Sequence, residues 1–436
     1  MSLIIFKPIC IYDDMKICVI GAGYVGLVTG VCFADTGNNV VFVDIDTDKV
    51  DKINALTPPI YEEGLEEMLG RNGERIEATK DYGAVEDADA VFICVGTPSN
   101  EDGSMNLSYV RKSVEAIAPH MGDEWKMLVV KSTVLPGTTE GVVIPLLEKL
   151  TKMKAGVDFG ISMNPEFLRE GKAIYDFTHP DRIVIGAYDK KSEEMMRNLY
   201  EPFKAPIFVT TPTTAEMVKY TSNSFLATKI SFANEIGNLC KKMGIDTYDV
   251  MEAVGMDHRI APYFLNSGAG FGGSCFPKDL SALISAGENA GIEMRILRAV
   301  MAVNDAQPVK MVELLKKHLG ELGGKKVAVM GLSFKTETDD VRDSRSIPVI
   351  RQLLEENAEV SAYDPLATEN MRKIFGGIEY CRNADDALRN AHGCLIMTDW
   401  KEFSRLNFDL MEKPVVIDGR RVVENREGLI YEGICW

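Results

Sequence analysis

Residues 268–279, GAGFGGSCFPKD, surround one cysteine with four glycines and place a lysine and an aspartate shortly after it. Glycines let a backbone come close to a ligand and expose the neighbouring thiol. A cation such as Lys278 would favour the thiolate, which is the nucleophilic form of cysteine. The pattern therefore predicts a reactive Cys275, with Lys278 and Asp279 ordering its surroundings, rather than an inert packed thiol.

A second candidate for chemistry is the stretch VIGAGYVG, which has glycines in G-x-G-x-x-G spacing directly after an apolar run. Gly21 permits the tight turn, Gly23 lets a pyrophosphate approach the backbone, and Gly26 lets helix and strand pack closely. The next apolar run, VVFVDID, ends with Asp44, where a carboxylate binds a ribose 2′-hydroxyl and disfavours NADP. We expect NAD to bind here. Asp46 is the rival for the ribose, and a glycine turn without a ligand is the alternative.

Polar residues also follow two later strand-like runs, in VGTP and KSTVLPGTT. Ligands of parallel sheets bind beyond the carboxyl ends of the strands. Thr97, Ser132 and Thr133 are therefore candidates to contact the cofactor or a reacting water. Ordinary turn chemistry explains the same residues about equally well.

The stretch NPEFLREG carries two acids four residues apart, Glu166 and Glu170. Asn164 and Pro165 suit an N-cap and a first helical position, so we expect the acids to share one helix face. Such a pair is more often solvated than catalytic. A position at a strand's carboxyl end, near the cofactor, favours a functional Glu166.

The stretch TTAEMVKYTSNSFLATKISFANEIGNLCKKMG has no interior proline and predicts one helix about 45 Å long. Thr213 and Glu216 fit a capping box at its start, and Gly244 fits its end. We expect this helix to be a connector and a subunit interface. Lys219 and Asn223 lie one turn apart on it and could meet at a single oxygen, or could lie on a solvated face.

These residues need elements that position them, and the chain of 436 residues is long enough for two or three domains. From Met15 to about Thr211, apolar runs alternate with amphipathic stretches, which predicts a mostly parallel sheet covered on both faces. A helix-rich stretch follows, and the alternation returns at Lys325. We expect an N-terminal extension (1–14), an α/β domain (15–211), a helical domain with Cys275 (212–320) and a second α/β domain (321–436).

The composition narrows the class of protein. The net charge of −17 disfavours nucleic acid or an anionic membrane as the main partner, because either needs clustered lysine and arginine. No apolar run is long enough to cross a membrane. The nine cysteines are scattered without a CxxC pair, and the five histidines have no ligand spacing. We therefore expect a cytoplasmic, reduced protein without a metal.

Six motifs resemble one known family. They are GAGYVG, NPEFLREG, VKYTSNSFLATKISFANE, GFGGSCFPKD, GLSFKTETDDVRDS and DGRRV. They occur in the order and spacing of the UDP-glucose/GDP-mannose dehydrogenase family, from Met15 to about Val423. Its GDP-mannose members usually have leucine where Phe276 stands, and relatives for N-acetylated sugars have histidine where Ser274 stands. The resemblance therefore favours UDP-glucose as the substrate.

The resemblance implies an NAD-dependent four-electron oxidation of UDP-glucose to UDP-glucuronate. Cys275 would attack the aldehyde formed by the first oxidation, giving a thiohemiacetal and then a thioester that water hydrolyses. Lys219 and Asn223 would stabilise the developing oxyanion.

For the hydrolysis, the resemblance implies that Asp279 and Thr133 hold the water and that Glu166 is the general base. The implied fold is α/β, with two Rossmann-like doubly wound domains joined by a long central helix in a helical dimerisation domain. The expected assembly is a homodimer or a higher homo-oligomer.

The resemblance also implies two sets of binding residues. Arg259 would come from a neighbouring subunit, residues 264–266 would form a strand-like wall, and the asparagine at 266 departs from members that have lysine there. The implied cofactor contacts are Gly21, Gly23, Tyr24, Val25, Gly26, Asp44, Lys49, Thr97, Thr133, Lys278 and Arg342. The implied substrate contacts are Glu166, Phe167, Leu168, Glu170, Lys219, Asn223, Arg259, Phe264, Leu265, Asn266, Gly272, Phe276, Phe334, Lys335 and Arg420.

Three alternatives remain open. The same chemistry on GDP-mannose or another nucleotide sugar is the nearest one. A two-electron dehydrogenase would use Lys219 without covalent catalysis. A non-enzymatic NAD-binding scaffold would leave the reactive setting of Cys275 without an explanation.

Overall fold

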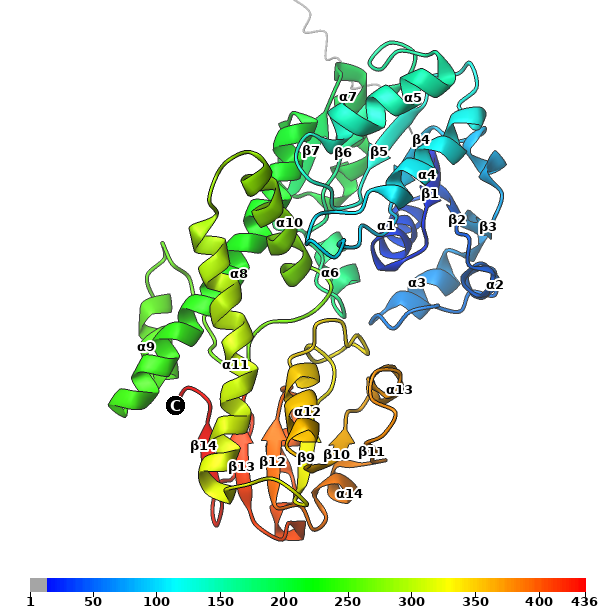
Figure 1. Cartoon of the computed structure of the whole chain (residues 1–436). Helices are drawn as coiled ribbons and strands as arrows, with labels where there is room; N and C mark the ends of the chain where they lie inside the picture. Colours follow the sequence, from blue (N-terminus) through cyan, green and yellow to red (C-terminus); the bar gives the residue numbers. More distant parts are fainter. Residues whose placement is uncertain (1–13) are drawn as a thin grey trace, which may run out of the picture. The chain divides into compact units, whose positions relative to one another are not determined.

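A computed structural model describes residues 14–436, and the chain divides between Tyr220 and Thr221 into two compact units (Figure 1). All but the last residue of the expected extension, 1–14, lies outside the described residues. Among the described residues, no helix is both long enough and apolar enough to span a membrane.

The first unit is built on an eight-stranded sheet in the order β3-β2-β1-β4-β5-β6-β7-β8. All neighbouring strands are parallel except β6 and β7, which confirms the predicted mostly parallel sheet. The strands are β1 (Lys16–Ile20), β2 (Asn39–Val43), β3 (Ile76–Thr79), β4 (Ala90–Ile93), β5 (Met127–Val130), β6 (Gly160–Met163), β7 (Ile183–Ala187) and β8 (Ile207–Thr210).

Helices cover both faces of this sheet because successive side chains of a strand point to opposite faces. Ile17 and Val19 of β1 belong to the core beneath α1, α3, α6 and α7, whereas Cys18 and Ile20 belong to the core beneath α4 and α5. The strands therefore read as continuous apolar runs. The helices are α1 (Tyr24–Asp35), α2 (Thr47–Asn54), α3 (Leu65–Arg71), α4 (Ser108–Ile117), α5 (Ile144–Thr151), α6 (Ala173–Thr178) and α7 (Lys190–Tyr200).

The long helix exists as predicted, as α8 (Pro212–Met243), and Gly244 follows it with a φ of +71°. The predicted capping box is wrong. The Glu216 carboxylate is fully buried and accepts hydrogen bonds from the Gly137 amide (2.6 Å), the Thr139 amide (2.8 Å) and the Thr139 hydroxyl (2.6 Å). Glu216 therefore holds the loop after β5 against α8 instead of closing the helix start.

The second unit contains the rest of α8, then the helices α9, α10 and α11, and then a six-stranded sheet with its own helices. Between α8 and the sheet lie α9 (Thr247–Gly255), α10 (Phe276–Asn289) and α11 (Arg295–Leu319). The sheet is parallel throughout, in the order β11-β10-β9-β12-β13-β14. Its strands and helices are β9 (Lys326–Met330), α12 (Ser346–Glu355), β10 (Glu359–Tyr363), α13 (Thr368–Arg372), β11 (Glu379–Tyr380), α14 (Ala384–Leu388), β12 (Gly393–Ile396), β13 (Val415–Asp418) and β14 (Ile430–Gly433).

Taken in chain order, both sheets contain the strand order 3-2-1-4-5-6 of a dinucleotide-binding fold. The turns after their first strands also match. Gly21 and Gly331 have φ values of +97° and +96°, and their amides donate to the carbonyl groups of Val43 and Tyr363 at 2.8 Å. The structure therefore confirms the prediction of two Rossmann-like doubly wound folds.

Replacing Glu216 by alanine would leave the buried Thr139 amide and the half-buried Gly137 amide without their acceptor. We expect a loss of about 2–4 kcal/mol of stability, seen as a fall of about 5–10 °C in the melting temperature of the full chain. Differential scanning calorimetry measures it. Glu235→Ala, at an exposed position of the same helix, is the matched control, and equal melting temperatures for the two variants would contradict this role of Glu216.

Candidate active site

The G-x-G-x-x-G loop of the first unit joins β1 to α1, at the strand-order reversal between β1 and β4. A β-carbon at Gly26 would lie 1.9 Å from the Gly21 carbonyl oxygen, so Gly26 is required for packing. A β-carbon at Gly23 would meet nothing within 4 Å, so this position opens onto free space at the helix N-terminus. The loop therefore fits a pyrophosphate approaching the first amides of α1, and Tyr24 and Val25 are the first residues of that helix.

The two rivals for the ribose have different surroundings. Asp44 follows β2 directly and accepts a hydrogen bond at 2.7 Å from the amide of Ala22, inside the glycine loop. Lys49 of α2 lies 3.8 Å from its carboxylate. Asp46 caps α2 by accepting from the Asp48 amide at 3.0 Å. Asp44 is therefore the carboxylate that lies beside the glycine loop.

The polar residues after β4 and β5 are joined to each other. The Thr97 hydroxyl donates to the Thr133 carbonyl oxygen at 2.8 Å, and the Ser132 hydroxyl donates to the Val95 carbonyl oxygen at 2.7 Å. The Ser132 hydroxyl proton is therefore already donated to a backbone carbonyl oxygen. Thr133 follows β5 by three residues and is half-buried, and its carbonyl oxygen holds Thr97.

Glu166 and Lys219 form a buried ion pair within the first unit, with 2.8 Å between the carboxylate and the ammonium. Both side chains are less than a tenth exposed. Burial raises the pKa of the Glu166 carboxyl, but the charge and hydrogen bond of Lys219 and the amide of Leu168 outweigh burial and bring this pKa below its usual value. Glu166 is therefore a carboxylate at neutral pH and able to accept a proton.

The predicted helix face for Glu166 and Glu170 is wrong, because residues 164–170 form neither helix nor strand and α6 begins only at Ala173. No helix begins at Asn164, and its side-chain oxygen accepts from the Lys131 ammonium (2.7 Å) and the Tyr200 hydroxyl (2.5 Å) instead of from helix amides. The half-buried Glu170 is therefore not a helical neighbour of Glu166.

Lys131 is a buried cation that the sequence reasoning did not single out. Its ammonium donates to the Asn164 amide oxygen at 2.7 Å and to the Tyr200 hydroxyl at 3.2 Å. Burial lowers the pKa of Lys131 to about 8. The contact joins the carboxyl ends of β5 and β6, the strands that lead to Thr133 and Glu166. A lysine directly after an apolar strand was the only signal in the sequence.

In the second unit, Asp279 is the centre of a polar cluster at the start of α10. It is 1% exposed, its Oδ2 accepts from the Asn223 amide at 2.7 Å, and its Oδ1 accepts from the Lys278 ammonium at 2.6 Å. Lys278 is therefore paired with Asp279, and the expectation that it serves the thiol directly is not supported. Asn223 lies one helical turn after Lys219 on α8.

Cys275 occupies the N-cap position of α10 and is the one exposed thiol among the eight cysteines described. Its sulfur lies 3.7 Å from the Ser274 hydroxyl, and its carbonyl oxygen accepts from the Asp279 amide at 2.9 Å. The other seven described cysteines are buried, which is the usual position of a cysteine that packs as a small hydrophobic residue.

The glycines before Cys275 are needed for packing within the second unit. A β-carbon at Gly268 would lie 2.5 Å from the carbonyl oxygen that follows β13, and one at Gly272 would lie 2.3 Å from the Asp343 carbonyl oxygen. A β-carbon at Gly273 would lie within about 3 Å of the Phe334 ring. Neighbouring backbone and an aromatic ring, rather than a ligand alone, therefore explain the glycine content.

Two of the residues expected to contact the substrate from the second α/β fold, Phe334 and Arg420, lie against this glycine loop. Phe334 packs on it, and the Lys335 ammonium lies 5.9 Å from the Phe334 ring centre. The Arg420 guanidinium donates to the Gly270 carbonyl oxygen at 3.2 Å and to the Met397 carbonyl oxygen at 2.8 Å. Arg420 and Phe334 therefore fix the loop that carries Cys275.

Two arginines expected to bind ligands have carboxylate partners nearby in the chain. Arg342 pairs with Asp340 and Arg259 with Asp257, each at 2.6 Å. Both guanidinium groups are well over half exposed.

The segment that was expected to form a strand-like wall is not a strand. Phe264 lies in a turn with a φ of +63°, Leu265 is buried, and Asn266 is exposed. The Phe276 ring packs between the rings of Phe264 (6.2 Å between centres) and Phe271 (5.8 Å).

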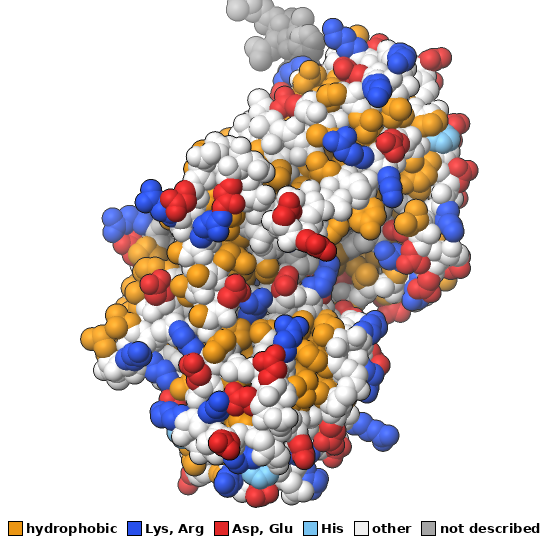
Figure 2. All heavy atoms as spheres, viewed as in Figure 1, with side chains coloured by type: hydrophobic (Ala, Val, Ile, Leu, Met, Phe, Trp, Pro, Cys, Tyr) orange, Lys and Arg blue, Asp and Glu red, His pale blue; other side chains and the backbone are white. Residues whose placement is uncertain are grey.

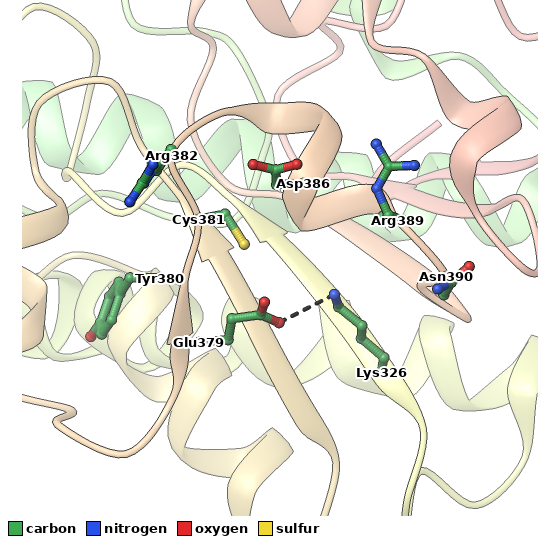
Figure 3. Close-up of a pocket in the computed structure, with 8 residues that line it drawn as sticks. All are labelled: Lys326, Glu379, Tyr380, Cys381, Arg382, Asp386, Arg389 and Asn390. Atoms are coloured by element: carbon green, nitrogen blue, oxygen red, sulfur yellow. Dashed lines mark ion pairs between the residues drawn. The ribbon is translucent and has the colours of Figure 1, made fainter.

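A cavity of about 390 Å³ lies elsewhere in the second unit, beside α14 and the first residue of β9 (Figure 3). Figure 3 shows Lys326 and Glu379 facing each other across it as an ion pair, 3.2 Å apart. Phe334 and Lys335 follow the opposite, carboxyl end of β9. The cavity therefore does not belong to the candidate active site.

Models of one family match three parts of the chain. The NAD binding domain of the UDP-glucose/GDP-mannose dehydrogenase family matches residues 15–204, its central domain residues 213–306 and its UDP binding domain residues 328–425. The UDP-glucose 6-dehydrogenase AglM of Haloferax volcanii is 46% identical over 96% of this chain and 100% of its own.

Solved structures of similar proteins have the same fold as this chain. A UDP-glucose dehydrogenase from Pyrobaculum islandicum is 45% identical with a TM-score of 0.93, over 97% of this chain and 98% of its own. A UDP-D-ManNAc dehydrogenase from Pyrococcus horikoshii is 30% identical with a TM-score of 0.87, over 96% and 99%.

Two glycines of the G-x-G-x-x-G loop are expected to differ in their contribution, Gly26 to the stability of the fold and Gly23 to the binding of NAD. Gly26→Ala overpacks the contact with Gly21 and should lower the melting temperature by about 3 °C or more. Gly23→Ala should leave the melting temperature within about 2 °C of the original while weakening NAD binding about tenfold or more. Scanning calorimetry and titration calorimetry give the two readings. Gly70→Ala, at an open position of α3, should change neither, and strong NAD binding by Gly23→Ala would contradict the assignment.

Proposed function

The chain belongs to the UDP-glucose/GDP-mannose dehydrogenase family, and on this premise we propose that it oxidises C6 of UDP-glucose to the carboxylate of UDP-glucuronate with two NAD. The alcohol loses a hydride and a proton to become an aldehyde, and the aldehyde is oxidised again while bound to the enzyme. Water supplies the second carboxylate oxygen.

UDP-glucose is the preferred sugar nucleotide for two reasons. The relatives named for UDP-glucose are 40–46% identical to this chain, against 35% for a GDP-mannose dehydrogenase and 30% for the relative named for UDP-D-ManNAc. Phe276 and Ser274 also occupy the positions at which the sequence favoured UDP-glucose. GDP-mannose is the second candidate.

The single observation that carries the covalent scheme is the exposed Cys275 thiol at the N-terminus of α10. The unpaired amides at a helix N-terminus favour the negatively charged thiolate. The thiolate adds to the aldehyde carbon, and the resulting thiohemiacetal loses a hydride to become a thioester. Hydrolysis then returns the thiol.

Lys219 and Asn223 are the groups that stabilise negative charge on the C6 oxygen. Their spacing of one turn on α8 suits convergence on a single oxygen, and donors held in place before the reaction need no reorganisation. The ion pair with Glu166 and the hydrogen bond to Asp279 hold the two side chains in place.

For hydrolysis of the thioester, Glu166 is the general base and Asp279 with Thr133 holds the water. The ion pair with Lys219 keeps Glu166 in its carboxylate form and holds it in place, so it can accept a hydrogen bond from the water. Asp279 accepts two hydrogen bonds already and is thus fixed in orientation.

The cofactor is NAD, which takes up the hydride at each oxidation when it is bound. The proposed pyrophosphate site is the open space at Gly23, and Asp44 is the proposed ribose ligand. The further proposed contacts are Gly21, Tyr24, Val25, Gly26, Lys49, Thr97, Thr133, Lys278 and Arg342. The proposed substrate contacts besides Glu166, Lys219 and Asn223 are Phe167, Leu168, Glu170, Arg259, Phe264, Leu265, Asn266, Gly272, Phe276, Phe334, Lys335 and Arg420.

We further propose that a second copy of the chain packs on α8. Phe225, Phe232 and Leu239 recur every seven residues along this helix, and each is more than half exposed. Figure 2 shows hydrophobic side chains gathered over the region of α9, the helix that follows α8 in the chain. Such a stripe is typical of a helix that packs against another helix, and the exposed Arg259 is then available to a neighbouring subunit.

A cytoplasmic location is proposed from the cysteines. None of the eight that the structure describes forms a disulfide, and a reducing compartment keeps the nucleophilic thiol of Cys275 intact.

The stoichiometry of NADH tests the covalent scheme. The wild-type chain should form two NADH per UDP-glucose and far less with GDP-mannose. Cys275→Ala should form at most one NADH per sugar and no acid, with the overall rate lowered at least about 10³-fold. Absorbance at the NADH band and chromatography of the product measure both.

The matched control is Ser274→Ala, which removes the neighbouring hydroxyl and should keep two NADH per sugar. One NADH per sugar in the wild type would favour the two-electron alternative. No NADH from UDP-glucose at millimolar concentration would exclude the proposed substrate.

The proposed assembly is tested by placing a charge in the exposed stripe of α8. The wild-type chain should have at least twice the mass of 48.2 kDa, whereas Phe232→Glu should shift towards the monomer because a buried charge at a subunit interface is costly. Light scattering coupled to gel filtration measures the mass. Phe208→Glu on β8, a similarly exposed position outside α8, should leave the mass unchanged, and a monomeric wild type would contradict the interface.

A further inference from the structure

Glu62 is a buried carboxylate that the proposed reaction does not use. It is 6% exposed and lies shortly before α3, far along the chain from both ligand-binding segments of the first unit. Its Oε2 accepts a hydrogen bond from the Tyr24 hydroxyl at 2.7 Å. Burial, together with the hydrogen bond and charge of Glu62, raises the pKa of the Tyr24 phenol. Tyr24 therefore stays protonated and remains a donor.

The remaining acceptor positions of Glu62 hold the segment expected to bind the sugar. Oε2 also accepts from the Gly171 amide at 2.8 Å, and Oε1 accepts from the Ala173 amide at 2.7 Å. These amides lie at the start of α6, where a helix leaves its first amides without internal partners. The end of the segment 164–171 is therefore held by a side chain from outside it.

Tyr24 touches the same segment directly. Its hydroxyl lies 2.9 Å from the Arg169 carbonyl oxygen, and the charge of Glu170 also raises the pKa of the Tyr24 phenol. Because residues 164–170 form neither helix nor strand, their conformation depends on such contacts. Asn164 holds one end of the segment, and Glu62 with Tyr24 holds the other.

Tyr24 also belongs to the dinucleotide loop. It follows Gly23 and is the first residue of α1, so its amide is among those that face a bound pyrophosphate. One side chain thus connects the cofactor loop to the sugar segment, and Glu62 completes the connection with three hydrogen bonds.

We propose that Glu62 is a positioning residue that couples NAD binding at the loop 21–26 to sugar-nucleotide binding at the segment 164–171. The inference rests on the function proposed above. A dinucleotide that fixes Tyr24 also fixes Glu62 and the end of the segment, so the sugar nucleotide binds to a segment that is already ordered. By linkage, the sugar nucleotide raises the affinity for NAD by the same factor.

The test measures this factor in the full chain by titration calorimetry. The dissociation constant of NAD is determined alone and with saturating UDP-xylose, which lacks C6 and so cannot be oxidised. In the wild type we expect NAD to bind about fivefold or more tightly with the sugar nucleotide present. In Glu62→Gln and in Tyr24→Phe the ratio should fall to about one, and the double variant should show no further loss.

Steady-state kinetics give a second readout. Both variants should raise the KM for UDP-glucose more than they lower kcat. In each variant the segment 164–171 has lost a contact that orders it before the sugar nucleotide binds, whereas the catalytic groups themselves are unchanged. Tyr24→Phe removes one hydroxyl only, so it keeps the test available if Glu62→Gln does not fold. Glu63→Gln, at the exposed neighbouring position, should keep both the ratio and the KM.

The outcomes separate the two proposals. A ratio near one in the wild type, or an unchanged ratio in variants whose melting temperature has fallen, would overturn the coupling and leave Glu62 a purely structural residue. Absence of NADH from UDP-glucose in the wild type would contradict the proposed function, and the calorimetric ratio with UDP-xylose would still decide the coupling.

Discussion

The structure depends on the burial of three polar side chains along α8. Glu216, Lys219 and Asn223 are spaced by three and four residues, which places them on one side of the helix. Each is buried, and a buried charge is tolerated only with a partner. Each of the three side chains therefore binds a partner on a different segment of the chain.

The partners of these side chains lie on segments that carry groups of the proposed reaction or precede them in the fold. Glu216 binds the loop after β5, Lys219 binds Glu166 after β6, and Asn223 binds Asp279 at the start of α10. Removing one member of a buried ion pair typically costs about 3–5 kcal/mol, so these contacts also hold their segments firmly. The helix expected to serve as a connector is thus also the element that orders the candidate catalytic groups.

Much of the fold was predictable because it rests on local patterns. The apolar runs predicted the central strands of both sheets, whereas the four edge strands, β3, β8, β11 and β14, were missed. Strand β11 has two residues, and β8 is only partly buried, so neither produces a continuous apolar run. The helix predicted from Asn164 failed because the Asn164 side-chain oxygen, which would have capped it, accepts from Lys131 and Tyr200, which are distant in sequence.

Some residues have a different role from the one that their neighbours in sequence suggested. The capping box at Thr213 was wrong because Glu216 finds stronger donors in another loop. The residues next to Lys278 suggested that it favours the thiolate, but it pairs with Asp279, and its contact with the cofactor stays a prediction from the resemblance. Glu62 and Lys131 drew no attention because their partners lie on segments far away in the chain, and no spacing rule reports such contacts.

The sequence alone determined three features: the alternation of strands and helices, the G-x-G-x-x-G spacing with Asp44 after the next strand, and the glycine-rich surroundings of Cys275. Each of them depends on residues that are close together in the sequence. The tertiary structure alone decided which charges are paired, which carboxylate lies beside the glycine loop, and why the glycines before Cys275 are needed. Burial and pairing are properties of side chains brought together from distant segments, and the free energy of a charge depends on those neighbours.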